Sequence, residues 1–257
     1  PLALVEYLAR ILGEDAGPGP DGHGFTPEHL VEGTSWWSRP AGDHVQVIGL
    51  DTCHHANGDG GRLGPRQVAW LEAELARHHA HHLDRRGETV ASGGEDRLVI
   101  VASHHNSWTI DNLGDDAFDP GPALDGPGLV ELLGRFPNVV AWINGHSHQH
   151  RVAAHPHAGD GPGWWEINTG SVIDFGQQGR TVELFDNGDG TLSFLVTLID
   201  HAAPPRAARP VADAWTAEAL ASTSRELAAN DDQWFEPLRL LGSAEDREVA
   251  QGDGRGP

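Results

Sequence analysis

Two histidine clusters each follow a short apolar segment of the chain. Leu98–Ala102 (LVIVA) runs into His104 and His105, and Val139–Ile143 runs into the sequence Gly145-His146-Ser147-His148. Short continuous apolar runs are typical of strands buried on both faces, and in open α/β sheets ligands bind at the carboxyl ends of such strands. Imidazole is the commonest metal ligand, and three converging imidazoles favour zinc, manganese, iron or cobalt. The pattern therefore indicates a metal site that draws on these histidines.

The other histidines show that a cluster alone does not make a site. The chain holds 17 histidines, so His-x-His pairs also arise by chance. Four of them follow an expected helix, and we interpret them as a solvated face that complements the helix dipole: His78, His79, His81 and His82. Three more lie in an expected loop, where we assign them no specific role: His150, His155 and His157.

The order of the expected elements predicts a mixed α/β fold with two or more packed layers. Helices are expected at Val5–Leu12, from Pro27, from Pro65, at Leu129–Phe136 and at Trp215–Ala229. Strands are expected at Val45–Leu50, Leu98–Ala102, Val139–Ile143, Trp164–Asn168, Arg180–Phe185 and Thr191–Leu198. Arg77–Asp84 is expected to be a frayed helix end and Gly87–Asp96 a polar loop, while Ala202–Pro210 has the composition of a linker.

The composition excludes several classes of function. Seventeen basic residues, all of them arginine, face 38 acidic residues and give a net charge of −21. Such an acidic chain is not expected to bind nucleic acid, and the absence of lysine excludes P-loop and Schiff-base chemistry. No apolar run approaches the roughly 18 residues of a membrane-spanning helix. The chain begins at Pro1 and contains no methionine, so we expect a piece of a longer protein or a processed one.

The ordered histidine motifs resemble the last two motifs of the calcineurin-like metallophosphoesterases. Ser103-His104-His105 precedes Gly145-His146-Ser147-His148 by some 40 residues. Further stretches resemble a bacterial branch of that superfamily with long inserts, often exported through a twin-arginine signal: Leu50-Asp51-Thr52, Gln67 with Trp70-Leu71-Glu72, SHHNSWTIDN at 103–112, WEINTGSVID at 165–174, Gln177–Arg180 and NGDGTL at 187–192. The likeness runs from about Gly22 to about Arg247.

This resemblance implies a two-sheet sandwich flanked by helices, with the N-terminal strands missing from this chain. Residues 1–201 would be the C-terminal part of the metallophosphoesterase domain, with residues 1–44 as an insert. Residues 202–257 would be a linker, a helix and a polar tail. The resemblance also raises export as a location and leaves the oligomeric state open.

The resemblance implies two divalent metal ions (Mn, Fe or Zn) and a small-molecule phosphoester substrate. His104 and His146 would bind the second metal, and His148 the first. His105 and Asn106 would contact the substrate phosphate, although His105 could instead pack beneath its loop. The family's earlier motifs, Asp-x-His, Gly-Asp-x-x-Asp and Gly-Asn-His-Asp/Glu, do not occur in order, so the catalytic histidine is expected upstream of this chain. We therefore expect this chain alone to hold at most one ion and to be inactive.

Two other functions fit the same residues. The chain could be a non-catalytic, acidic, histidine-rich module that binds metal or a partner. It could also be a mononuclear zinc hydrolase of another fold, which uses His104, His146 and His148 with a bound water. The three hypotheses differ in the number of metal ions and in the activity of this chain alone.

Overall fold

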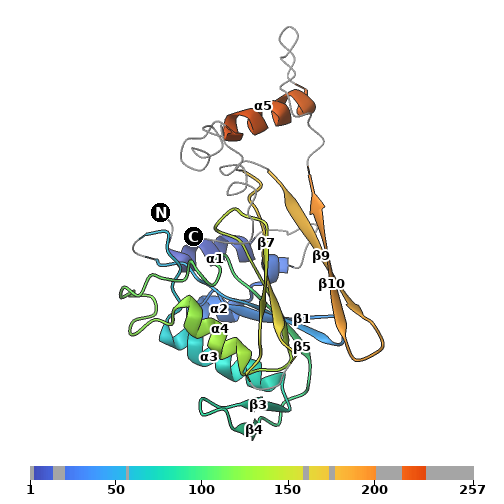
Figure 1. The fold of residues 1–257 in the computed structure, drawn as a ribbon. Helices are drawn as coiled ribbons and strands as arrows, with labels where there is room; N and C mark the ends of the chain where they lie inside the picture. The colour runs from blue at the N-terminus through green and yellow to red at the C-terminus, as the bar shows by residue number, and fades with distance from the viewer. Residues whose placement is uncertain are drawn as a thin grey trace. The chain divides into compact units, whose positions relative to one another are not determined.

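The computed structural model describes residues 3–13, 21–55, 58–158, 162–173, 177–200 and 216–229. The chain divides into two units, Pro1–Asn144 with Ala154–Glu166, and Gly145–Ala153 with Ile167–Pro257. Figure 1 labels most of their helices and strands.

A six-stranded mixed sheet has the strand order β1-β2-β5-β6-β8-β7. Its strands are β1 (Trp37–Ala41), β2 (Val45–Gly49), β5 (Leu98–Ala102), β6 (Val139–Asn144), β7 (Arg151–His155) and β8 (Trp164–Asn168). β2, β5 and β6 are parallel neighbours, and β1 runs antiparallel to β2. The sheet confirms the mixed α/β class that the sequence predicts.

Two helices connect the parallel strands of the first unit. α3 (Pro65–Arg77) links β2 to β5, and α4 (Gly126–Gly134) links β5 to β6. Such crossovers are right-handed, so two in a row place both helices on one face of the sheet. Figure 1 shows α3 and α4 together there. Their apolar faces meet the strands in one core, which includes Leu71, Leu75, Leu129, Leu133, Val99, Val101 and Val139.

The N-terminal elements confirm two more predicted helices. α1 spans Leu4–Leu12, and α2 spans Pro27–Glu32 after a short 3₁₀ turn at Asp21–Gly24. α2 begins where the sequence predicts, since Thr26 is its N-cap and Pro27 its first residue. The His29 ring closes the cap by accepting a hydrogen bond of 3.0 Å from the Thr26 amide.

The segment after α3 differs from its expected frayed helix and polar loop. β3 (His81–Leu83) pairs antiparallel with β4 (Thr89–Ala91). Nor is the histidine face wholly solvated, because the His79 side chain is fully buried and packs edge-on against Phe136 at 5.2 Å. His82 stacks on the same ring at 4.7 Å. The prediction was wrong because His79 and His82 pack against Phe136, which lies just past the end of α4 and is distant in sequence. This packing outweighs the polarity of the local sequence.

Three further boundaries differ from expectation. β1 and β7 were not predicted: β1 contains Pro40 and lies at the sheet edge, and β7 is largely polar or small. α4 begins three residues before Leu129, because the Asp125 carboxylate accepts from the Gly128 amide at 2.8 Å and caps the helix.

The loop expected around 150–157 is also incorrect in part. His155 ends β7, and the Nε2–H of buried His157 donates to the Val139 carbonyl at 3.1 Å.

The second unit contains an antiparallel hairpin, β9 (Gly179–Asp186) with β10 (Leu192–Ile199), joined by a short turn that includes Gly188 and Gly190. α5 (Ala217–Ala229) confirms the predicted helix in this region. The linker predicted at Ala202–Pro210 lies outside the described residues. Within the described ranges, no helix is both long enough and apolar enough to cross a membrane. The missing N-terminal strands and the domain boundaries stay predictions.

Candidate functional site

The carboxyl ends of β2, β5 and β6 bring chemistry-bearing segments to one edge of the sheet. The parallel ladders continue one residue past the strands, with Leu50 N donating to Ala102 O at 2.8 Å and Ser103 N to Ile143 O at 3.1 Å. Residues 50–55 and 103–107 therefore leave the sheet side by side. The sequence predicts this placement for the histidines after β5, and the strand register confirms it.

His104 and His105 have different surroundings. His104 is exposed, whereas His105 is 4% exposed, and the two rings meet edge-on at 4.9 Å. His105 Nε2 lies 2.7 Å from the Asp59 carbonyl, so that nitrogen carries the proton. Nδ1 then accepts from the Thr52 hydroxyl at 2.8 Å. Both ring nitrogens of His105 thus hold the loop, and metal binding through Nδ1 would displace Thr52.

Burial keeps His105 in its neutral form. Desolvation lowers the pKa of the His105 imidazole below its usual value, although the bond to the Asp59 carbonyl and nearby aspartates oppose this shift. Gly61 permits the close packing, since a Cβ there would lie 2.5 Å from the His105 ring. The backbone amide of His105 also donates to Thr52 Oγ1 at 3.2 Å. Residues 50–55 and 58–61 therefore interlock with the loop after β5.

Asn106 is fully buried beneath the same loop. Its Oδ1 accepts from the Thr109 hydroxyl at 2.8 Å and from the Trp108 amide at 3.3 Å. These bonds shape the turn at 106–110. The substrate contacts predicted for His105 and Asn106 stay predictions, and the bonds described here are ones that such contacts would have to share or replace.

In the second unit, the loop that carries His146 and His148 has an unusual backbone. Both residues adopt positive φ angles, 68° and 55°, which non-glycine residues rarely do. Asn168 of β8 holds the loop from beneath, donating to the Gly145 carbonyl at 2.5 Å and accepting from Ser147 Oγ at 2.8 Å. Backbone strain of this kind persists only where surrounding contacts enforce it, and it concentrates at functional sites.

Among the described residues, His104, His105 and His146 form a group that could hold a metal ion. Two of the three predicted ligands, His104 and His146, are in this group. His148 is not in it, and its role as a ligand stays a prediction. The group contains imidazoles and no carboxylate, which suits zinc and other transition metals better than magnesium or calcium.

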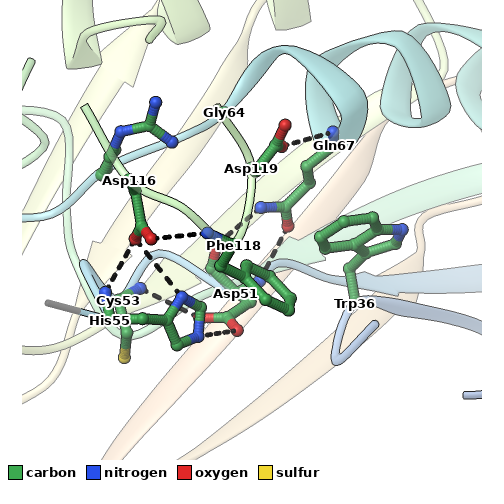
Figure 2. A pocket seen from close by; sticks show the side chains of 10 residues that line it. Trp36, Asp51, Cys53, His55, Gly64, Gln67, Asp116, Phe118 and Asp119 are labelled. Carbon is green, nitrogen blue, oxygen red and sulfur yellow. Dashed lines mark hydrogen bonds and ion pairs between the residues drawn. The ribbon is translucent and has the colours of Figure 1, made fainter. Parts of the chain in front are cut away.

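Sequence reasoning missed a second cluster, built around His55 (Figure 2). His55 Nε2 lies 3.3 Å from Asp51 Oδ2, and Nδ1 lies 3.4 Å from Asp116 Oδ2. The ring also packs on Phe118 at 4.1 Å. Hydrogen bonding to Asp51 is the main cause that raises the pKa of the His55 imidazole, against the effect of burial. The two carboxylates therefore favour the protonated form of His55, whose ring can then donate to both of them.

A rigid scaffold positions this cluster. α3 begins at Pro65, and its N-cap Gly64 has no side chain to cap the helix. Asp119 supplies a cap by accepting from the amides of Arg66 and Gln67, both at 3.1 Å. A Cβ on Gly64 would lie 2.3 Å from the Asp119 carboxylate. The side-chain amide of Gln67 bonds to both backbone groups of Asp51. Its Oε1 accepts from the Asp51 N–H at 2.8 Å, and its Nε2 donates to the Asp51 carbonyl at 2.6 Å. Asp51 and α3 thereby hold each other in place (Figure 2).

Comparison with known proteins gives one partial likeness. Part of the chain is similar to a probable cyclic nucleotide phosphodiesterase of Synechococcus sp. (strain WH7803), with 34% identity over 97 residues. The match spans 38% of this chain and 30% of the relative. A scan against protein families finds no match. The name of this relative is compatible with a metallophosphoesterase-type family.

Proposed function

We propose that this chain is part of a metal-dependent phosphoester hydrolase of the binuclear metallophosphoesterase type. The observation that carries the proposal is the sheet edge, where parallel strands β2, β5 and β6 each end next to a histidine-bearing segment. The partial likeness to a probable cyclic nucleotide phosphodiesterase supports phosphodiesters as the substrate class. The substrate is then a small phosphoester rather than nucleic acid, because a chain with a net charge of −21 repels the phosphate backbone of nucleic acid.

Each residue of the site has a distinct part in this proposal. His104 and His146 hold one divalent ion, and His148 contributes to the neighbouring ion position. A bound ion there would neutralise phosphate charge and polarise the phosphoryl group. His105 stays neutral and fixes the loop that presents His104, while Asn106 shapes the turn behind it.

The proposal places the remaining ligands in a longer protein. The histidine group lacks the carboxylate that would bridge two ions. We therefore propose that this chain alone binds at most one ion and does not hydrolyse phosphoesters, and that upstream sequence supplies the bridging ligand and the catalytic histidine.

The test compares this chain with the product of the open reading frame that surrounds the Pro1 codon. The 257-residue chain, dialysed against Zn²⁺ or Mn²⁺, should hold at most one ion by elemental analysis and should not cleave bis(4-nitrophenyl) phosphate. The longer reading frame should encode Asp-x-His, Gly-Asp-x-x-Asp and Gly-Asn-His-Asp/Glu in order. Its product should hold two ions and cleave the diester.

Two outcomes would overturn the proposal. One tightly bound zinc with diesterase activity in the 257-residue chain would establish a mononuclear hydrolase, which the three-imidazole group also suits. A reading frame without the upstream motifs, whose product is inactive, would favour a metal-binding or interaction module.

A further inference from the structure

A buried carboxylate, Glu166, takes no part in the proposed chemistry. Its side chain belongs to β8 and is 1% exposed. Burial of a carboxylate costs free energy unless several donors compensate for it. Glu166 therefore needs a dense set of partners, and the identity of those partners indicates what the residue does.

Four hydrogen bonds reach the Glu166 carboxylate from three different segments. Oε1 accepts from the Ser107 amide at 2.9 Å and from Asn144 Nδ2 at 2.8 Å. Oε2 accepts from the Ser107 hydroxyl and from His155 Nε2, both at 2.8 Å. These donors outweigh burial and bring the pKa of Glu166 below its usual value, so the group is ionised. The His155 ring is itself fixed by stacking on Trp164 at 4.4 Å.

The donors stand next to the candidate metal ligands in the chain. Ser107 follows His105 by two residues, and Asn144, the last residue of β6, precedes His146 by two. Two residues further along β8, Asn168 supports the His146 loop within its own unit. One strand therefore carries the supports of both histidine segments.

We infer that Glu166 is a positioning residue that holds the histidine segments after β5 and β6 in the geometry that binds metal. This inference rests on the proposed metal site. Such outer supports fix ligand orientation, and their loss commonly weakens metal binding by about 10–100-fold. Glu166 acts through Ser107 and Asn144 rather than on the ion itself.

The test measures the Zn²⁺ affinity of the 257-residue chain and its variants by competition with a fluorescent chelator. Circular dichroism first shows that each variant is folded. Glu166→Ala should weaken zinc binding by about tenfold or more. Glu166→Gln keeps one oxygen acceptor for Ser107 and Asn144 and offers an amide to the Ser107 hydroxyl, so affinity should stay within about threefold of the parent.

Glu74→Ala provides the matched control. Glu74 is also a buried carboxylate, 7% exposed, but its partners Arg77 and His78 lie at the end of α3. Its loss should lower stability without changing zinc affinity. If Glu74→Ala weakens zinc binding as much as Glu166→Ala does, the effect of Glu166 is general destabilisation and the inference fails.

Hydrogen exchange of the metal-free chain separates this inference from the proposed function. Glu166→Ala should speed amide exchange in peptides covering 103–110 and 139–147 while leaving α3 unchanged. If the parent chain binds no zinc, the proposed metal site fails, and the exchange result still decides whether Glu166 orders these segments. Unchanged exchange and unchanged zinc affinity in Glu166→Ala would overturn the inference alone.

Discussion

Two histidine-rich segments of the first unit look alike in sequence and differ in structure. Residues 78–82 follow α3, and residues 103–107 follow β5. His79 is buried with both ring nitrogens bonded to backbone: Nδ1 donates to the Leu75 carbonyl at 2.6 Å, and Nε2 accepts from the Asn138 amide at 2.9 Å. His104, by contrast, is exposed at the edge of a parallel sheet.

The contrast shows that the density of histidines does not define a site, because His79 is a buried structural ring whereas His104 is exposed. His105 resembles His79 in this respect, because its two nitrogens are bonded to Thr52 and to the Asp59 carbonyl. Only its neighbour His104 combines the strand-end position with exposure. The proposed function therefore assigns the ligand role to His104 and a structural role to His105.

The largest expected effect is the loss of stability on replacing His79. His79→Ala removes a buried ring that contacts Phe136 and leaves the Asn138 amide without its acceptor. We expect a loss of about 3 kcal/mol in the free energy of unfolding, measured by urea denaturation. His81→Ala is the control, because His81 is exposed and should change stability by less than about 0.5 kcal/mol. Equal small effects would mean that both ends of the cluster are solvated.

The pH dependence of stability provides the next effect. Burial lowers the pKa of His79 to about 4, against the opposing influence of the Leu75 carbonyl and Asp96. Because the folded pKa lies below the unfolded value near 6.5, the unfolded state takes up the proton first. The contribution of His79 to the free energy of unfolding is greatest above pH 6.5 and falls as the pH drops toward 4. At pH 5 this contribution is lower by roughly 2 kcal/mol.

Urea denaturation at pH 7 and pH 5 measures this contribution. His79→Gln removes the titrating ring and should reduce the loss of stability between the two pH values by roughly 2 kcal/mol. His81→Gln should leave the loss unchanged. An unaltered pH dependence in His79→Gln would place the acid sensitivity in other buried histidines, such as His157, whose pKa burial also lowers.

The sequence predicts those parts of the fold that local pattern determines. The apolar runs of β5 and β6, the capped start of α2 and the proline that opens α3 are determined by neighbouring residues. β3 and β4 have three residues each and little hydrophobic pattern, so only their pairing identifies them as strands. The buried state of His79 likewise depends on Phe136, which lies on a distant segment.

The candidate site follows the same division. Histidines that come directly after strands can be located from sequence, because parallel strand ends meet at one edge. The bonds of His55 to Asp116 and of Glu166 to Ser107 join residues about 60 positions apart, and no local pattern signals them. The positive φ angles of His146 and His148 come from contacts of their loop, since the residue type disfavours them.

The last prediction sharpens the contrast within the adjacent pair. His104→Ala should weaken Zn²⁺ binding by about tenfold, or roughly 1.4 kcal/mol, because a ligand is lost. Its exposure means that stability should change by less than about 0.5 kcal/mol. His105→Ala should do the reverse, costing about 1–2 kcal/mol of stability through the lost bonds to Thr52 and Asp59, with the smaller effect on zinc. Chelator competition and urea denaturation on the same preparations measure both quantities. If His105→Ala weakened zinc binding more than His104→Ala and left stability intact, His105 would be the ligand, and the Thr52 hydroxyl would have to give up its bond to Nδ1 when the metal binds.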